Sequence, residues 1–300
     1  MPMMTTPFEP NSLSSLSATD RVAVIAGSGR LPVNVADSLE SAGHSPFVVM
    51  IDGEADKGAG LERFDHESLP LENAGALRGL LKRRKITHVV LAGGIARRPA
   101  LRSYKINLGL IAALPRLARA LTRGDDGMLK LLIAHIEAAG IKVVGAHEIV
   151  PDLLAMEGVM TRVAPQKDDW SDLTAAKRAA LAIGALDIGQ AAVSIGGRVV
   201  ALEGIEGTDG LLERVKDLRG HGRIANRKRG VIVKCAKPDQ EVRADLPAIG
   251  PMTIDGAHAA GLAGIGVEAG RSLILDFSEV VSRADALGLF VVGLTAEQKP

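Results

Sequence analysis

Oxygen-bearing side chains crowd one short segment, LEGIEGTDG, which should join a strand to a helix. Within seven residues lie Glu203, Glu206, Thr208 and Asp209. Carboxylates at this spacing can hold Mg²⁺ while leaving coordination positions for a substrate phosphate. The same pattern is typical of a capped helix, with Thr208 as the N-cap and acidic residues favoured by the helix dipole. Both interpretations stay open at this point.

A second charged cluster follows the apolar run GVIVKCA and fills segment 234–251. Its polar side chains are Lys234, Lys237, Asp239, Gln240, Glu241, Arg243 and Asp245. The ammonium groups could neutralise a phosphate, while a carboxylate binds a metal or takes a proton from water. The charge mix therefore predicts a phosphate-handling loop, with a solvated loop as the alternative.

Near the N-terminus, the segment IAGSGRLP places a glycine-rich turn between a strand and a helix. Its backbone N–H groups and the helix dipole could receive a phosphate or a ribose. Asp52, at the end of the next strand, stands where a ribose-binding acid would. However, Pro32 has no N–H and replaces the third glycine of a dinucleotide fingerprint, which disfavours NAD. The turn predicts either contact with the nucleotide part of another ligand or glycines that only shape a tight turn; its candidate residues are Gly27, Ser28, Gly29 and Leu31.

Two further candidate positions follow later strands. Gly93 and Gly94 end the third predicted strand, and Arg97 and Arg98 come just beyond them. Open α/β sheets bind ligands at this edge, and two guanidinium groups can grip a diphosphate in bidentate fashion. His147 ends the fourth predicted strand, where it could contact the same ligand.

The sequence lacks the motifs that are typical of several other enzyme chemistries. The sequence has no HExxH pattern for zinc, no GxSxG turn for a serine hydrolase and no GxxxxGK[ST] loop for ATP. The single cysteine, Cys235, lies in an apolar run, which excludes an internal disulfide and indicates a buried thiol. A net charge of +1 argues against nucleic acid as the partner.

The elements that must position these residues alternate between strands and helices. Strands are predicted at 22–26, 46–52, 87–93 and 141–146. Helices are predicted at 32–43, 72–85, 106–121 and 128–140. This alternation predicts an α/β fold, with a Rossmann-like parallel sheet covered by helices on both faces over residues 20–150.

The periodicity fades over residues 151–170, which we interpret as a linker. A second α/β domain with a mixed sheet is predicted for residues 171–300. Its expected helices are at about 172–186, 252–262 and 277–288. Its expected strands are a pair within 189–203 that turns at Gly196–Gly197, followed by 230–236, 264–270, 272–276 and 289–293.

Composition agrees with this fold class. Hydrophobic residues make up 47% of the chain but aromatic residues only 2%, so the core must consist mainly of Ala, Val, Ile and Leu. Residues 1–19 are polar and predict a disordered tail without a signal sequence. No apolar run reaches the roughly 18 residues of a membrane span, so we expect a cytoplasmic protein.

Several blocks together resemble the LpxI family, whose members are UDP-2,3-diacylglucosamine pyrophosphatases of lipid A biosynthesis. The matching blocks are IAGSGRLP, GDDGMLKLL, VVGAHEIVPDLL, LDIGQAAVS, EGTDGLLERV, KCAKPDQEVRADLPAIGPMTI and AGLAGIGVEAG. They run in order from about Arg21 to Gly293, so the resemblance covers nearly the whole chain except the tail.

The resemblance implies a Mg²⁺-dependent hydrolase that converts UDP-2,3-diacylglucosamine into UMP and 2,3-diacylglucosamine 1-phosphate, known as lipid X. It also implies two domains that hold the substrate between them, a homodimer, and an essential aspartate in the block RADLPAIG. In this sequence that residue is Asp245. Because the substrate resides in the inner membrane leaflet, peripheral contact with that membrane is expected.

Chemistry supplies the remaining assignments. Asp245, with Glu206 or Asp209, is predicted to hold Mg²⁺ and to orient a water for in-line attack. The cations Lys237, Arg97 and Arg98 would offset charge on the departing group. The other predicted substrate contacts are Gly27, Ser28, Gly29, Leu31, Gly93, Gly94, His147, Gln190, Thr208 and Gln240. The apolar segment 106–121 could be a groove for acyl chains or an ordinary core helix.

Two other functions stay open. An NAD-dependent oxidoreductase is motivated by Gly27, Gly29 and Asp52. A regulator that binds a nucleotide sugar without cutting it would leave the acidic residues as helix caps and solvated faces.

Overall fold

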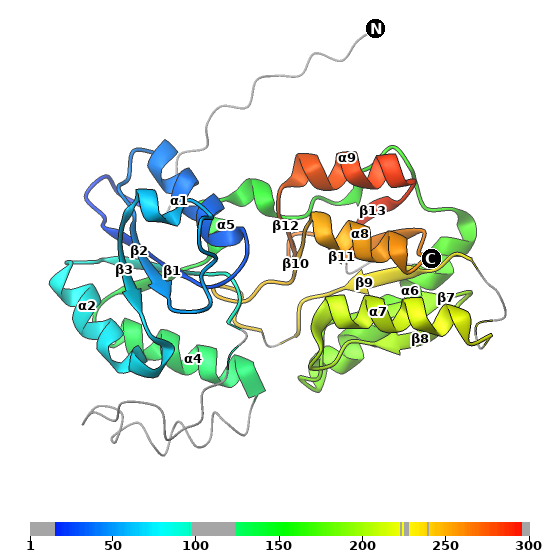
Figure 1. The fold of residues 1–300 in the computed structure, drawn as a ribbon, viewed down its shortest axis with the longest axis horizontal. Helices are drawn as coiled ribbons and strands as arrows, with labels where there is room; N and C mark the ends of the chain where they lie inside the picture. The colour runs from blue at the N-terminus through cyan, green and yellow to red at the C-terminus, as the bar shows by residue number, and fades with distance from the viewer. Residues whose placement is uncertain are drawn as a thin grey trace, which may run out of the picture. The chain divides into compact units, whose positions relative to one another are not determined.

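The chain folds into two compact units, Met1–Pro151 and Asp152–Pro300, in a computed structural model (Figure 1). The structure describes residues 16–95, 97, 124–222, 224, 228–238 and 240–295. Most of the predicted N-terminal tail, the predicted helix at 106–121, Arg98 and Asp239 lie outside these residues. Each unit contains its own sheet, so the two are described separately.

The sheet of the first unit has five parallel strands in the order β3-β2-β1-β4-β5. The strands are β1 (Val22–Ala26), β2 (Phe47–Ile51), β3 (Asp65–Leu69), β4 (His88–Ala92) and β5 (Lys142–Val144). Parallel strands covered on both faces need apolar side chains at every position, and β1 and β2 are buried throughout. The four predicted strands and the Rossmann-like parallel sheet are confirmed.

Strand β3 was missed by the sequence analysis. Its residues, DHESL, are exposed or half-buried except for the last one. Among the described strands it pairs with β2 alone, at the edge of the sheet, so it needs no apolar run and gives no hydrophobic signal.

Helices cover both faces of this sheet. They are α1 (Leu31–Ser41), the 3₁₀ turns η1 (Leu61–Arg63) and η2 (Leu71–Ala76), α2 (Leu77–Arg83), α4 (Gly124–Glu137) and α5 (Ala146–Ile149). Val35 and Leu39 of α1 pack with Ile149 of α5 against β1 and β4. Figure 1 shows α2 and α4 on the opposite side of the strands from α1 and α5.

The second unit has a six-stranded mixed sheet in the order β6-β13-β11-β9-β7-β8. Strands β9 (Val231–Lys234), β11 (Gly264–Glu268) and β13 (Phe290–Leu294) are parallel. The antiparallel strands are β6 (Gly158–Val159) beside β13, and β7 (Ala191–Ile195) between β9 and β8 (Arg198–Leu202). The mixed sheet predicted for this domain is therefore confirmed.

Two short strands differ from the expected pattern. The predicted strand at 272–276 shortens to β12 (Leu273–Ile274) and pairs with β10 (Ala248–Ile249) in a separate parallel ribbon. Neither β10 nor β6 was predicted, because two residues are too short to show a periodicity.

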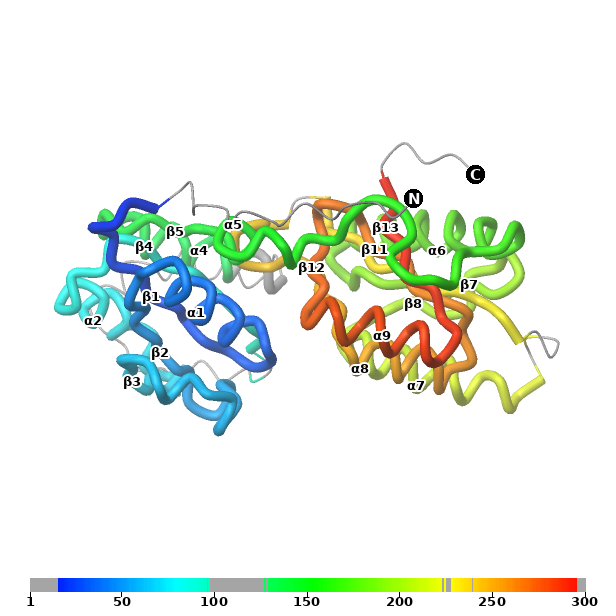
Figure 2. Tube along the Cα trace, turned by 90° about the horizontal axis from the view of Figure 1, so that it is seen from above, coloured from blue at the N-terminus to red at the C-terminus, as the bar shows by residue number. Residues whose placement is uncertain are grey.

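The helices of this unit form two layers. They are α6 (Lys167–Ala185), α7 (Gly207–Gly220), α8 (Pro251–Ala259) and α9 (Phe277–Leu287). Leu173 and Ala176 of α6 pack on one face of the sheet, and α7, α8 and α9 contribute to the core on the other face. Figure 2 shows α6 on the opposite side of the strands from these three helices.

The segment predicted as a linker, 151–170, contains η4 (Pro151–Leu153), β6 and the first turn of α6. Helix α6 begins at Lys167, five residues before the expected start, because the N–H of Gln166 donates to the Asp169 carboxylate at 2.8 Å and closes its first turn. Among the residues that the structure describes, no helix is both long enough and apolar enough to cross a membrane.

Candidate functional site

The first unit joins the glycine-rich turn after β1 to the end of β4. The Ser28 N–H donates to the Gly94 carbonyl at 2.8 Å, and the Gly94 N–H donates back to the Ser28 carbonyl at 3.1 Å. A Cβ atom on Gly27 would lie 2.2 Å from the Gly94 oxygen, and one on Gly93 would lie 2.4 Å from the Ser28 oxygen. The glycines are therefore required for two backbones to approach this closely.

This pairing consumes backbone donors that a phosphate would need. The Ser28 N–H is bonded to Gly94, and the Gly29 N–H donates to the Asp56 carboxylate at 2.8 Å. Leu31 and Pro32 begin α1 directly after the turn. The two glycine-containing segments singled out in the sequence thus lie together at this edge, and Asp56, which was not predicted, holds one of the donors.

Arg97 was predicted to bind a substrate diphosphate, but in the structure it contacts other residues of its own unit. Its backbone N–H and its Nε donate to Oε1 of Glu54 at 3.0 and 3.1 Å, and its Nη2 donates to the Asp52 carbonyl. The Glu54 side chain is buried, whereas that of Arg97 is about half exposed. Arg97 therefore neutralises a buried carboxylate of its own unit.

His147 lies in the first turn of α5, directly after β5, at the edge where the sequence placed it. Its Nδ1 atom is buried and has no hydrogen-bond partner in the part of the chain that the structure describes. The position is compatible with ligand contact, which stays a prediction.

In the second unit, strand direction gathers the chemically active loops at one edge of the sheet. Strands β8, β9, β11 and β13 run the same way, and β7 runs against them. The ends of β8 and β9 therefore lie beside the start of β7, where Ala191 pairs with Lys234 and Ala192 with Leu202. Both polar clusters of the sequence belong to this edge, because one follows β8 and the other follows β9.

A continuous hydrogen-bond network crosses this edge. Thr208 Oγ1 donates to Glu203 Oε1 at 2.6 Å, and Lys234 Nζ donates to Thr208 Oγ1 at 2.9 Å. The Gln190 N–H donates to the other Glu203 oxygen at 2.8 Å, while Lys234 also donates to the Ala248 carbonyl at 3.1 Å. Thr208 Oγ1 therefore both donates and accepts a hydrogen bond. It is not the N-cap of α7, which is the alternative that the sequence left open, because the N-cap position is Glu206.

Lys234 is the buried charge of this network. Burial lowers the pKa of its ammonium, while the nearby carboxylates Glu203, Asp245 and Asp209 act in the opposite direction. Its direct hydrogen bonds go to neutral oxygens, those of Thr208 and Ala248. The loop after β8 and the loop after β9 thus meet around one cation.

Asp245 is oriented by the loop in which it lies. Gln240 Nε2 donates to Asp245 Oδ2 at 2.7 Å, and the Lys237 N–H donates to Gln240 Oε1 at 2.9 Å. The Lys237 ammonium pairs with Asp187 Oδ1 at 2.5 Å. Asp245, Gln240 and Lys237, all predicted from one charged segment, therefore form one connected group.

Glu206 and Asp209, the two acids predicted as possible metal ligands beside Asp245, differ in their contacts. Glu206 pairs with Arg214, and a bond from its own backbone N–H, supported by Arg214, lowers its pKa. Asp209 is exposed in the first turn of α7. Among the described residues, no group of three or more His, Cys, Asp or Glu side chains could hold a metal ion.

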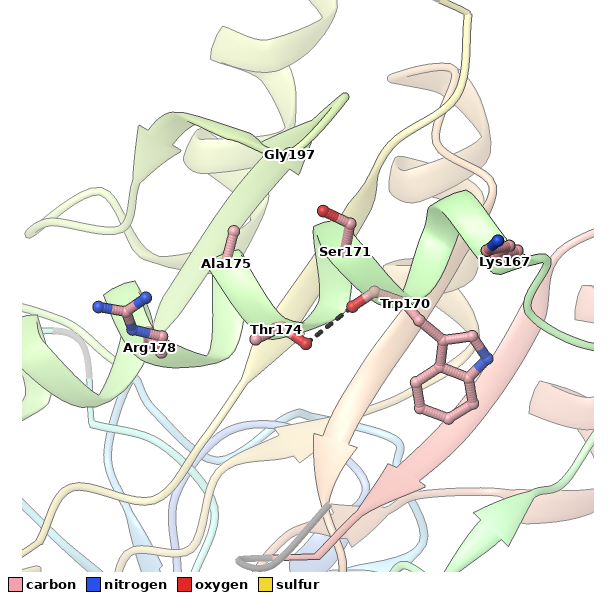
Figure 3. Close-up of a pocket in the computed structure, with 7 residues that line it drawn as sticks. All are labelled: Lys167, Trp170, Ser171, Thr174, Ala175, Arg178 and Gly197. Carbon is pink, nitrogen blue, oxygen red and sulfur yellow. Dashed lines mark hydrogen bonds between the residues drawn. The ribbon is translucent and has the colours of Figure 1, made fainter. Parts of the chain in front are cut away.

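A surface pocket of about 500 Å³ lies elsewhere on this unit. Figure 3 shows Trp170, Thr174 and Arg178 along one face of α6, close to Gly197 of the β7–β8 turn. That turn is at the opposite end of β7 from Ala191, so the pocket does not include the predicted site residues.

Lys234 and Glu203 have a more central place in the structure than their sequence context predicts. Each was noticed only as one charge in a polar segment, yet the structure makes them the centre of the network. One signal was present: Lys234 ends the apolar strand VIVK, and a charge in a buried strand needs partners. The prominent acid Glu206 was favoured instead.

Comparison with known proteins identifies the family. A model described as the LpxI N-terminal domain matches residues 21–153, and one described as the LpxI C-terminal domain matches residues 156–292. The chain belongs to the LpxI family. It is also 38% identical, over 93% of its length and 99% of the relative's, to a UDP-2,3-diacylglucosamine pyrophosphatase LpxI of Caulobacter vibrioides. The LpxI resemblance found from the sequence blocks is confirmed, and the two LpxI models meet close to the boundary between the two compact units.

Proposed function

We propose that this protein hydrolyses the diphosphate of UDP-2,3-diacylglucosamine to UMP and 2,3-diacylglucosamine 1-phosphate, lipid X, as a step of lipid A biosynthesis. The observation that carries the proposal is the 38% identity along 93% of the chain to a UDP-2,3-diacylglucosamine pyrophosphatase. Asp245, which Gln240 orients and which lies close to the Lys234 ammonium, supports it, because a carboxylate beside a cationic group suits attack on a diphosphate.

Asp245 is the proposed catalytic acid or base. Gln240 donates to one carboxylate oxygen and therefore fixes the orientation of the other toward a reacting water. A neutral amide partner leaves the negative charge of Asp245 available, which a guanidinium partner would offset. Lys237 lies in the same loop, and its ammonium, now paired with Asp187, could exchange that partner for a phosphate oxygen.

Mg²⁺ is part of the proposal. Mg²⁺ usually keeps several waters and takes one or two protein carboxylates together with substrate phosphates. Asp245 fits this mode, because the neutral Gln240 amide is its side-chain partner in the described structure. A three-carboxylate site with Glu206 and Asp209 does not fit, because Glu206 is paired with Arg214. When bound, Mg²⁺ would neutralise charge on the diphosphate.

Peripheral contact with the inner membrane is a further part of the proposal. Three apolar side chains protrude from the loops at the same edge as Lys234: Leu186, Ile188 and Ile205 are 70%, 54% and 90% exposed. An exposed apolar rim beside a polar site suits an amphiphilic substrate that is taken from a bilayer. Co-sedimentation with vesicles of anionic lipid checks this contact, and sedimentation velocity checks the homodimer expected from the family resemblance.

The two alternatives differ from this proposal in measurable ways. For an NAD-dependent oxidoreductase, nicotinamide cofactors would raise the melting temperature. The donors of Ser28 and Gly29 are held by Gly94 and Asp56, which argues against such a cofactor in the turn after β1. A non-catalytic nucleotide-sugar sensor would bind the substrate without releasing UMP.

The test is release of UMP from UDP-2,3-diacylglucosamine by the purified protein, with Mg²⁺ or with a chelator. We expect metal-dependent formation of UMP and lipid X by the wild type and loss of both products with Asp245→Ala. An Asp245→Ala variant with full turnover would overturn the role of Asp245. A folded wild type that forms neither product would overturn the function.

A further inference from the structure

The loop that carries Asp245 is closed at its base by a side chain. Lys234 is the last residue of β9, and Ala248 is the first residue of β10. Lys234 Nζ donates to the Ala248 carbonyl at 3.1 Å, so one side chain joins the two ends of the intervening loop. Gln240 and Asp245 are bonded to each other inside that loop.

The same ammonium also fixes a second loop. Lys234 Nζ donates to Thr208 Oγ1 at 2.9 Å, and Thr208 donates to Glu203 at 2.6 Å. Glu203 in turn accepts the N–H of Gln190 at 2.8 Å, which ties the start of β7 to the turn between β8 and α7. Removal of the ammonium would release both loops at once.

The buried position of Lys234 imposes a desolvation penalty on its ammonium group. The strand residues before it, Val231 to Val233, are buried and apolar, and Lys234 is only 9% exposed. An ammonium without a direct carboxylate partner is poorly stabilised in such a place, whereas an apolar residue would pack at lower cost. A fixed positive charge close to Asp245 accounts for its presence, since the substrate brings a diphosphate.

We propose that Lys234 is a positioning residue for the hydrolysis: through Thr208 and Ala248 it holds the two loops of the site in their reactive arrangement, and it supplies a fixed positive charge beside Asp245. The inference rests on the proposed function, since it concerns the same site. Thr208 acts in the same network, as the hydroxyl that transmits the position of Lys234 to Glu203.

A purely structural lysine would affect folding alone, and the chain offers a matched control. Arg219 of α7 is also partly buried and donates to backbone carbonyls, those of Ala260 and Gly261, at 2.6 and 2.7 Å. Those carbonyls precede β11, at the end of the sheet opposite to Lys234. Arg219→Met therefore removes a similar set of bonds far from the site.

The experiment compares kcat, KM and melting temperature for five proteins: the wild type, Lys234→Met, Thr208→Val, Thr208→Ser and Arg219→Met. We expect Lys234→Met to lower kcat about 100-fold and to change KM less than about threefold, because displaced catalytic groups slow the reaction more than they weaken binding. Thr208→Val should lower kcat about tenfold, and Thr208→Ser, which keeps the hydroxyl, should restore it to within about threefold of the wild type. Arg219→Met should lower the melting temperature and leave kcat unchanged.

Other outcomes overturn the inference. If the Lys234 and Thr208 variants have lower melting temperatures but the kcat of the wild type, both residues have only a structural role. If Lys234→Met does not fold, Thr208→Val and Thr208→Ser still test the inference. Equal kcat values for these two variants would show that the Thr208 hydroxyl does not position the site. An active wild type with equally active variants contradicts this inference alone, whereas a wild type that releases no UMP contradicts the proposed function as well.

Discussion

The two units present the same kind of sheet edge, the one at which parallel strands end, but they treat charge there differently. In the first unit, charges and donors are satisfied by near neighbours: Arg97 by Glu54, and the Gly29 N–H by Asp56. In the second unit, Lys237 and Glu206 are also paired with opposite charges. The buried Lys234 ammonium, however, bonds to neutral oxygens, and Asp245 accepts from a neutral amide.

The difference shows which edge is prepared for a reaction. A locally neutralised edge is stable and gains little by binding an ion, because existing pairs must first be broken. An edge with charges of both signs that are close together but not directly paired can act on a polar bond that is placed between them. Loop position alone therefore does not identify a site, and the partners of each charge must be known.

The largest effect should come from removal of the Asp245 charge. Asp245→Asn keeps the shape of the side chain but removes its negative charge, so we expect kcat for UMP release to fall about a thousandfold. The melting temperature should stay within about 2 °C of the wild type, because Asp245 is half-buried and its side-chain partner among the described residues is the neutral Gln240 amide. The matched control is Asp255→Asn in α8, which loses an exposed pair with Arg283 and should keep full turnover. Equal activity of the two variants would contradict the assignment of the reaction to the sheet edge of the second unit.

The next largest effect concerns the backbone contact in the first unit. In Gly93→Ala, the new Cβ would meet the Ser28 oxygen at 2.4 Å in a residue with φ of 85°. We expect the free energy of unfolding, measured in urea, to fall by about 3 kcal/mol, from the left-handed conformation and the steric clash together. Gly43→Ala is the control, because its φ is 84° but no atom lies within 4 Å of the new Cβ. It should cost only about 1 kcal/mol, and similar losses for both variants would show that the contact is unimportant.

The sequence was informative where periodicity and motif spacing coincide. The strands of the first unit other than β3 appear as apolar runs. Gly27 and Gly93 mark the place where the loops after β1 and β4 come into contact. The turn at Gly196–Gly197 was also predictable, because both residues adopt positive φ in a two-residue hairpin. These features depend on neighbours in sequence or on backbone sterics.

Side-chain partners could not be predicted in the same way. Asp56 reaches Gly29 across 27 residues, and Glu54 reaches Arg97 across 43. Nothing in the local pattern distinguishes Glu206, which pairs with Arg214, from Glu203, which joins the central network. The choice depends on strand register and loop geometry, which a single sequence does not specify.

Arg97 offers a smaller and more discriminating test. Removal of its charge by Arg97→Met leaves the buried Glu54 carboxylate without that partner, and we expect a loss of about 1 to 2 kcal/mol in unfolding free energy. The value lies below that of a fully buried pair, because Arg97 is about half exposed and solvent screens it. The KM for UDP-2,3-diacylglucosamine should change less than about threefold. A tenfold rise in KM with unchanged stability would instead support the diphosphate grip that the sequence suggested.

Cys235 directly follows Lys234 but packs on the α6 face of the sheet, and it tests whether that face excludes water. Burial, assisted by the nearby Glu268 carboxylate, raises the pKa of its thiol to about 12, so the reactive thiolate is scarce at neutral pH. At pH 8 we expect iodoacetamide to label the native protein roughly a thousandfold more slowly than the urea-unfolded protein, as measured by mass spectrometry. Because the folded pKa lies above the value of 9.0 for an unperturbed thiol, the contribution of this group to stability is complete below pH 9 and is lost as the pH rises toward 12. Cys235→Ala should lack that part of the pH dependence. Rapid labelling of the native protein would mean that water reaches the α6 face of the sheet, where Cys235 packs with Leu173 and Val233.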